Sequence, residues 1–167
     1  MTCGYRALAD RIRQEFVQID RVVSRCSEAM ALAREQDDPS FYMEAAALNL
    51  HGFYNGTERV FQMILRHVDG GKWKGERWHR EVLDRVAQGQ EGIRPPVISG
   101  DIHDSLVEYL GFRHIARNIY GFDLRVPGVT ELVERLEPLW KRLRDEFTTF
   151  AEFLEKRSGG GEGENQG

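Results

Sequence analysis

The sequence predicts an all-α protein, an antiparallel helical bundle of four to five helices. Apolar residues recur at spacings of three and four over long stretches, which is the pattern of amphipathic helices. No stretch alternates apolar and polar residues as a half-buried strand would, and no internal repeat is visible. With 167 residues, 41% of them hydrophobic and 30% charged, the chain has the length and composition of a globular domain with a substantial core.

The first helix is indicated by an apolar stripe held for three heptads. It ends before Asp38 and Pro39, because Asp38 can cap a following helix and proline fits a first helical turn. The second helix then spans residues 41 to about 67. Gly52 and Gly56 lie four residues apart on one of its faces, and two interpretations remain open, close packing against another helix or a functional groove. The stripe of the first helix consists of Ile12, Phe16, Ile19, Val23, Cys26, Met30 and Ala33.

Two shorter helices are expected in the middle of the chain. The third covers residues 78–88 and is followed by a segment, 89–99, that two prolines keep from being helical. Ser99 or Asp101 can cap the fourth helix, which is expected to end near Gly121.

The last helix is expected over residues 129–156, and Pro138 is expected to kink it or split it in two. Residues 1–157 then form a single domain. The final ten residues, 158–167, contain five glycines, two glutamates and no hydrophobic residue, which predicts a disordered tail.

Charge, hydropathy and cysteine content narrow the functional classes. The 23 Lys and Arg residues against 27 Asp and Glu give a net charge of −4, which argues against bulk electrostatic binding of nucleic acid but allows a local basic patch. No apolar run is long enough to span a membrane and the N-terminal segment is polar, so we expect a cytoplasmic protein with no membrane partner. Cys3 and Cys26 lie about 35 Å apart along one helix, too far to pair. They are expected to be reduced thiols, with Cys26 in the core.

Metal-ligand motifs are weak. The Glu-x-x-His pair that di-iron bundles use twice occurs once, as Glu76 and His79, and no Cys-x-x-Cys or phosphate-cradling glycine motif is found. We therefore expect no metal and no cofactor. His79, next to Trp78, is expected to cap or pack the short third helix.

Polar residues crowd the end of the fourth helix. At 100° per residue, Arg113, Arg117 and Tyr120 fall within about 60° of one another, and His114 and Asn118 form an adjacent row. Two guanidinium groups and a phenol on one face can bind an anion such as a phosphodiester. The other interpretation, in which both arginines form salt bridges with neighbouring helices, stays open at this point.

These residues resemble the motif of the HEPN ribonuclease superfamily, which reads arginine, a polar residue, three further residues and histidine, often followed by x-Tyr. The stretch from Arg113 to Tyr120 matches at the arginine, the polar position and the tyrosine. More of the chain, about residues 41–124, resembles the HepT-like branch of that superfamily. The matching segments are 48–59, 78–83, 94–98 and 109–114.

The resemblance implies a helical homodimer that places two copies of the motif across a cleft where RNA is cut without metal. His51 and Tyr54 match positions that line this cleft and, with Arg117, would contact RNA phosphates. HepT toxins are paired with a small nucleotidyltransferase antitoxin, which neutralises them by attaching AMP to the motif tyrosine. The matching position for this modification is Tyr120.

One departure from the family pattern bears on mechanism, because Asn118 occupies the position of the family's histidine. An asparagine hydrogen-bonds a phosphate but does not shuttle a proton. If catalysis is retained, Arg113 binds the phosphate and His114, one turn before Asn118, is the base. The alternative is a catalytically impaired module that binds RNA or the nucleotidyltransferase through Arg113, Arg117 and Tyr120 without cleaving.

Overall fold

The computed structural model describes residues 2–118 and 127–160, with side chains described for residues 4–113 and 128–160. The described chain is all-α and contains five α-helices, which confirms the predicted fold class. In chain order the helices are α1 (Thr2–Ala33), α2 (Ser40–Ile64), α3 (Trp78–Val86), α4 (Gly100–Asn118) and α5 (Pro127–Gly159), with a short π-helical segment η1 (Leu65–Asp69) continuing α2.

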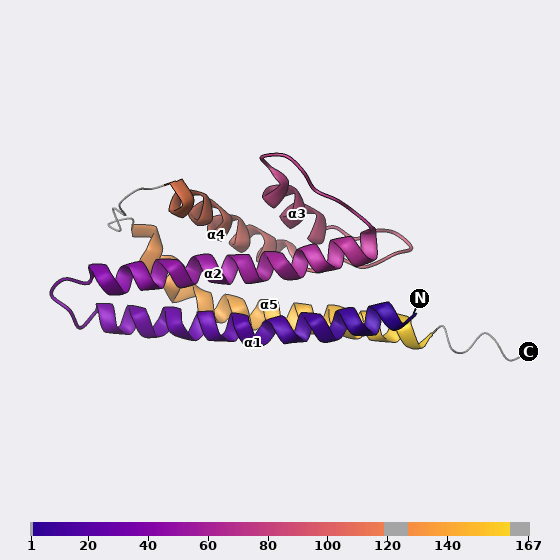
Figure 1. The fold of residues 1–167 in the computed structure, drawn as a ribbon, viewed down its shortest axis with the longest axis horizontal. Helices are drawn as coiled ribbons and strands as arrows, with labels where there is room; N and C mark the ends of the chain where they lie inside the picture. The colour runs from indigo at the N-terminus through magenta and orange to yellow at the C-terminus, as the bar shows by residue number, and fades with distance from the viewer. Residues whose placement is uncertain (1, 119–126, 161–167) are drawn as a thin grey trace, which may run out of the picture.

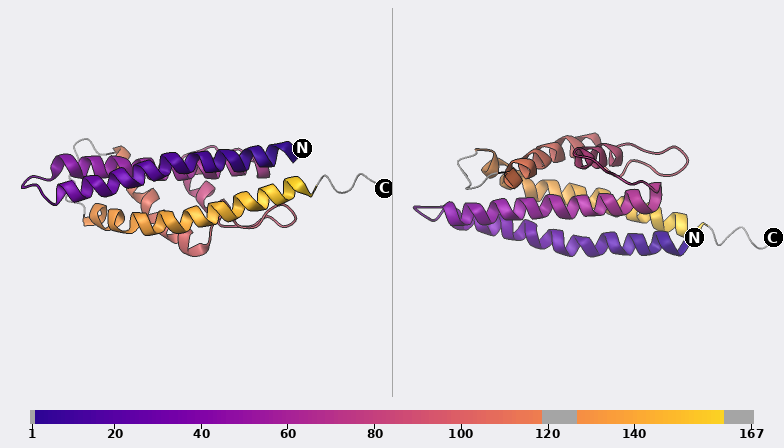
Figure 2. Two further views of the ribbon diagram at one scale, coloured as in Figure 1. Left: turned by 90° about the horizontal axis from the view of Figure 1, so that it is seen from below. Right: turned by 45° about the horizontal axis from the view of Figure 1, so that its top comes forward.

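Three long helices form the body of the molecule. α1 packs against both α2 and α5, and α1 and α2 run antiparallel (Figure 1). α3 and α4 contact each other and lie on α2, on the side away from α1 (Figure 1 and the right view of Figure 2). The core between the long helices is rich in aromatic rings in edge or stacked contact, namely Phe16, Phe53, Phe61, Tyr109, Trp140 and Phe147.

The helix boundaries follow local hydrogen bonding as expected. Asp38 Oδ1 accepts a hydrogen bond from the backbone N–H of Ser40 at 3.1 Å, at the start of α2. Ser99 Oγ accepts one from the N–H of Ile102 at 3.4 Å, so Ser99 caps α4. Gly70 ends η1 with a φ of 69°, in the left-handed region that glycine adopts without strain. The expected end of α4 near Gly121 lies outside the described residues.

The two glycines of α2 lie against α1, which settles the open question in favour of close helix packing. A Cβ built on Gly56 would lie 2.9 Å from Cγ1 of Ile19, and one built on Gly52 would lie 3.4 Å from Cγ1 of Val22. A larger residue at position 56 would therefore push α1 and α2 apart.

The expected split of the last helix is absent, because α5 is one continuous helix with Pro138 inside it, and the expected kink stays a prediction. Proline removes one backbone hydrogen bond. Apolar residues on both sides of Pro138 are buried, including Leu136 and Leu139, and their packing offsets this loss. α5 extends to Gly159, past the expected domain end at residue 157, and residues 161–167 of the predicted tail lie outside the described residues.

Cys26 is a buried free thiol, as expected for a core residue. Its Sγ donates to the carbonyl oxygen of Ala46 at 3.5 Å, and burial raises the pKa of the thiol to about 12. None of the described helices combines the length and the apolar content needed to cross a membrane.

Candidate active site

Arg113 projects from α4 toward α2 and α3, where two side chains hold it. Its Nε donates to Oδ1 of Asn55 on α2 at 3.1 Å, and its NH1 lies 3.4 Å from Nε2 of His79 on α3. The side chain is half-buried. The motif arginine is therefore positioned by two other helices and fixed in orientation by its contact with Asn55.

His79 lies in the first turn of α3, and both of its ring nitrogens have partners. Nδ1 lies 2.7 Å from Oε2 of Glu58 on α2, and Nε2 faces Arg113. A guanidinium only donates, so a hydrogen bond between Arg113 and His79 requires Nε2 to accept, which places the ring proton on Nδ1, where it is donated to Glu58. The indole of Trp78 lies against the ring at a centroid distance of 3.6 Å. The imidazole thus has a defined tautomer and a defined plane.

Glu58 is buried in the middle of α2, with its side chain 5% exposed, and the His79 side chain is 16% exposed. A buried carboxylate is costly unless it is paired and hydrogen-bonded. The sequence assigned to His79 only a capping or packing role in α3, whereas its ring joins α3 to α2 and α4. Its Nδ1 binds Glu58, and the Glu76-x-x-His79 spacing plays no part in this contact.

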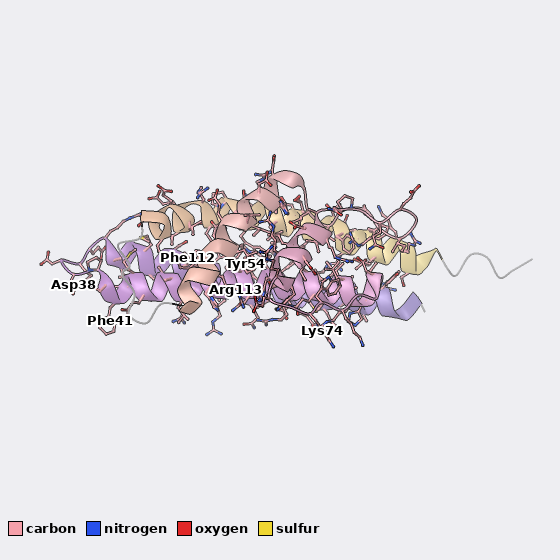
Figure 3. All side chains as sticks on the ribbon, turned by 90° about the horizontal axis from the view of Figure 1, so that it is seen from above. Asp38, Phe41, Tyr54, Lys74, Phe112 and Arg113 are labelled. Carbon is pink, nitrogen blue, oxygen red and sulfur yellow. The ribbon has the colours of Figure 1, made fainter. Side chains whose placement is uncertain are left out.

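Tyr54 lies one turn before Glu58 on α2 and close to Arg113 (Figure 3). Its side chain is 1% exposed, and no described group bonds its hydroxyl. Burial raises the pKa of this phenol, and the charge of Glu58 raises it further, while Arg113 acts in the opposite direction. Tyr54 thus lies buried close to Arg113, and its predicted contact with RNA phosphate stays a prediction.

The other predicted site residues are placed less fully. His51 is half-buried on α2, one turn before Asn55. The side chains of His114, Arg117 and Asn118, in the last turns of α4, are outside the described residues, as is Tyr120 altogether. Their roles stay predictions.

Arg94, from one of the segments that resemble the family, is structural. All five of its N–H donors are used: two bind the carboxylate of Asp69 at 2.7 and 2.9 Å, and three bind backbone carbonyls. The side chains of Arg94 and Asp69 are each 1% exposed. This ion pair fastens the segment after α3 to the end of η1 and adds no positive charge to the surface.

Across the described residues, no group of three or more His, Cys, Asp or Glu side chains is arranged to hold a metal ion. The chemistry that the described groups offer is an oriented cation, an imidazole whose Nε2 faces that cation at 3.4 Å, and a buried carboxylate behind the imidazole. These groups suit phosphate binding and proton transfer.

A family model described as HepT-like protein matches residues 45–154. The chain belongs to the HepT-like protein family. The match confirms the resemblance found in the sequence and extends it through most of α5, and it contains every residue of the Arg113 site. No curated protein and no solved structure matches this HepT-like chain.

Sequence reasoning found Arg113 and Tyr54 but did not place Glu58 and His79 in the site. Glu58 and His79 are 21 residues apart on different helices, so no short motif joins them. One signal was available: Glu58 follows Tyr54 by four positions and precedes Phe61 by three, so it shares the buried face of α2 with both. A carboxylate on such a face requires a partner.

Proposed function

We propose that this HepT-like protein is the toxin-type component of a toxin–antitoxin pair, a cytoplasmic homodimer that cleaves RNA phosphodiester bonds without a metal ion. The observation that carries the proposal is the fixed guanidinium of Arg113 beside the imidazole of His79. Cleavage by a neighbouring 2′-hydroxyl requires a cation on the phosphate and a proton acceptor close to it.

The hydrogen bond to Asn55 supports the assignment of Arg113 to the phosphate. It occupies Nε, while NH1 lies 3.4 Å from Nε2 of His79. A guanidinium offers parallel N–H donors that match two phosphate oxygens. Among the described residues, the contacts of Arg113 are with Asn55 and His79 and not with a carboxylate, so its charge is available to an incoming phosphate.

The test is cleavage of a labelled RNA by the purified full chain in excess chelator, with the same sequence in DNA as a substrate that lacks the 2′-hydroxyl. We expect cleavage of RNA alone, and loss of cleavage in Arg113→Ala. Arg135→Ala is the matched control. Arg135 lies on α5, is exposed, and pairs with Glu108 on α4, the helix that carries Arg113. Lack of cleavage by clean wild-type protein would refute the proposal.

A second candidate function is binding without cleavage, and Asn118 is the residue that favours it. In that case the wild-type protein binds RNA or a nucleotidyltransferase without cutting, and Asn118→His switches cleavage on, because it restores the family's histidine. An RNA-binding measurement on wild type and a cleavage assay on Asn118→His separate the two functions.

The regulatory part of the proposal is attachment of AMP to Tyr120 by a nucleotidyltransferase antitoxin. A small nucleotidyltransferase encoded next to this chain is the expected partner. Incubation with that enzyme and ATP should add AMP to wild-type protein and not to Tyr120→Phe, as read by intact-protein mass spectrometry. Light scattering on the purified protein tests the homodimer.

A further inference from the structure

Glu58, His79 and Arg113 form a chain of contacts that crosses three helices. The carboxylate of Glu58 accepts from Nδ1 of His79 at 2.7 Å, and Nε2 of His79 faces NH1 of Arg113 at 3.4 Å. The three side chains become more exposed in that order, from 5% at Glu58 to 16% at His79 and to the half-buried Arg113. The sequence motif at residues 113–120 contains neither Glu58 nor His79.

We propose that His79 is the general base of the cleavage reaction, oriented by Glu58, and that it supplies the proton transfer that Asn118 cannot. The inference rests on the proposed function, since it names the group that performs one of its steps. His79 is then a catalytic residue, and Glu58 is a positioning residue that acts through it.

The tautomer is the one that the reaction requires. With its proton on Nδ1 and donated to Glu58, the ring keeps its Nε2 lone pair available to take a proton. An imidazole held through its other nitrogen by a buried carboxylate is the arrangement that orients a base and stabilises the imidazolium formed from it. The Trp78 indole, tilted by 31° to the imidazole at a centroid distance of 3.6 Å, further restricts rotation of the ring.

The position of His79 beside Arg113 matches the geometry of the substrate. The 2′-hydroxyl belongs to the ribose that carries the scissile phosphate, so the group that binds the phosphate and the group that takes the proton must be neighbours. The 3.4 Å contact between Arg113 and His79 is at the long limit of a hydrogen bond, so little is lost when substrate replaces it. Phosphate oxygens then occupy NH1, and the hydroxyl meets Nε2.

The proposed reaction is an intramolecular transesterification at phosphorus. Nε2 of His79 takes the proton of the 2′-hydroxyl, the 2′-oxygen forms a bond to phosphorus, and the bond from phosphorus to the 5′-oxygen breaks. The 5′-oxygen takes a proton from water and the imidazolium returns its proton to solvent. The products are a 2′,3′-cyclic phosphate and a 5′-hydroxyl, and no oxidant, reductant or metal is consumed.

Tyr54 points to a ligand at the same place. Its hydroxyl is buried, has no hydrogen-bond partner among the described groups, and lies close enough to Glu58 and Arg113 for both charges to act on it. A buried hydroxyl without a partner is costly, so its retention beside an oriented base and cation is explained if substrate or an ordered water bonds it.

The experiment measures single-turnover cleavage of RNA in excess chelator by four full-length variants. His79→Gln keeps a side chain of similar size and polarity without a proton-accepting nitrogen, and should slow cleavage by about 10²–10⁴-fold with RNA affinity little changed. Glu58→Gln should slow cleavage less and alter the pH–rate profile, because the imidazole of His79 loses its hydrogen bond to a charged carboxylate. His67→Gln is the matched histidine control, since His67 lies on η1 and binds the carbonyl of Met63. His114→Gln tests the motif histidine.

The outcomes separate this inference from the proposed function. If wild type does not cleave, the proposed function fails. If wild type cleaves and Arg113→Ala abolishes cleavage, but His79→Gln cleaves at the wild-type rate, the proposed function stands and the role of His79 is refuted. Loss of cleavage in His114→Gln, together with an active His79→Gln, assigns the base to His114 and also refutes the proposed role of His79.

A second measurement distinguishes loss of the catalytic group from loss of the fold. His79→Ala should regain part of its cleavage rate when imidazole is added to the buffer, whereas a purely structural defect would not respond. A folded His79→Ala protein that binds RNA, does not cleave and is not rescued at any imidazole concentration would overturn the proposal. Thermal melting of each variant reports the fold independently.

Discussion

The contact between α1 and α2 at Gly56 makes a sharp prediction about stability, because the chain contains its own control at Gly52. Both glycines are inside α2 and face α1, and replacement of either by alanine brings the same gain in helix propensity, about 1 kcal/mol. The two sites differ in the space available. At Gly52 the new Cβ lies 3.4 Å from Val22, an ordinary contact, whereas at Gly56 it lies 2.9 Å from Ile19.

The packing cost at Gly56 sets the magnitude. The contacted atom, Cγ1 of Ile19, is inside a side chain that is 1% exposed, so it cannot move without displacing its neighbours. Overpacking of this kind costs about 1–3 kcal/mol. Gly52→Ala is therefore expected to stabilise the protein by up to about 1 kcal/mol. Gly56→Ala should be less stable than Gly52→Ala by the packing cost, about 1–3 kcal/mol.

Urea unfolding of wild type and both variants measures these differences, with m-values that should not change. A double-mutant cycle identifies the cause: combined with Ile19→Ala, which removes the contacted atom, Gly56→Ala should lose most of its cost, a coupling of about 1–3 kcal/mol. If Gly56→Ala is as stable as Gly52→Ala in the wild-type background, the argument from close helix packing is wrong.

Three further predictions concern other parts of the structure. Arg94→Met should lower the free energy of unfolding, measured in urea, by about 3–5 kcal/mol, because it leaves the buried carboxylate of Asp69 without its partner. The control is Arg157→Met, which removes two exposed contacts with backbone carbonyls and should cost under about 1 kcal/mol. Burial lowers the pKa of His103, but the hydrogen bonds that its ring donates to the carboxylates of Asp104 and Asp84 outweigh burial and raise the pKa overall. The stabilisation is complete below the unfolded pKa of about 6.5 and is lost as pH rises through the folded pKa. The melting-temperature gap between wild type and His103→Gln should therefore narrow from about pH 5 to about pH 8.5. Tyr54→Phe should leave the urea midpoint unchanged or raise it, because it removes an unpartnered buried hydroxyl, and a large loss of stability would show that the hydroxyl is bonded in solution.

The sequence predicted those parts of the fold that depend on local spacing. The stripe from Ile12 to Ala33 predicted α1, and Ser99 caps α4 as one of its two predicted candidates. At α2 the N-cap residue is Pro39, and the predicted cap, Asp38, accepts from the N–H of Ser40 one position earlier. The expected split at Pro138 is absent because proline acts on one backbone hydrogen bond, whereas the burial of apolar residues on both sides of it decides whether the helix continues.

The interpretation of the glycines could not be decided from the sequence, because a groove and a helix contact place the same demand on side-chain size. Only the partner distinguishes them, and the partner of Gly56 is Ile19 on the preceding helix. The pairing of Arg94 with Asp69 could not be predicted for the same reason, because the two residues are 25 positions apart and become a buried ion pair only in the folded chain. Such long-range contacts depend on tertiary packing, which periodicity does not report.

The candidate site contains residues that the linear motif does not include. The motif at 113–120 places its residues on one helix, and its two candidates for proton transfer, positions 118 and 114, both lie on that helix. The fold adds groups from two other helices at the position of Arg113: Asn55 and Glu58 from α2, and His79 from α3. A proton-transfer group is needed beside the phosphate, but nothing in the chemistry requires it to come from the same helix as the arginine. In the proposed mechanism, His79 supplies the proton transfer that asparagine at position 118 does not. The decisive comparison is between His79→Gln and Asn118→His: if His79 is the base, the first loses activity and the second is not needed for it.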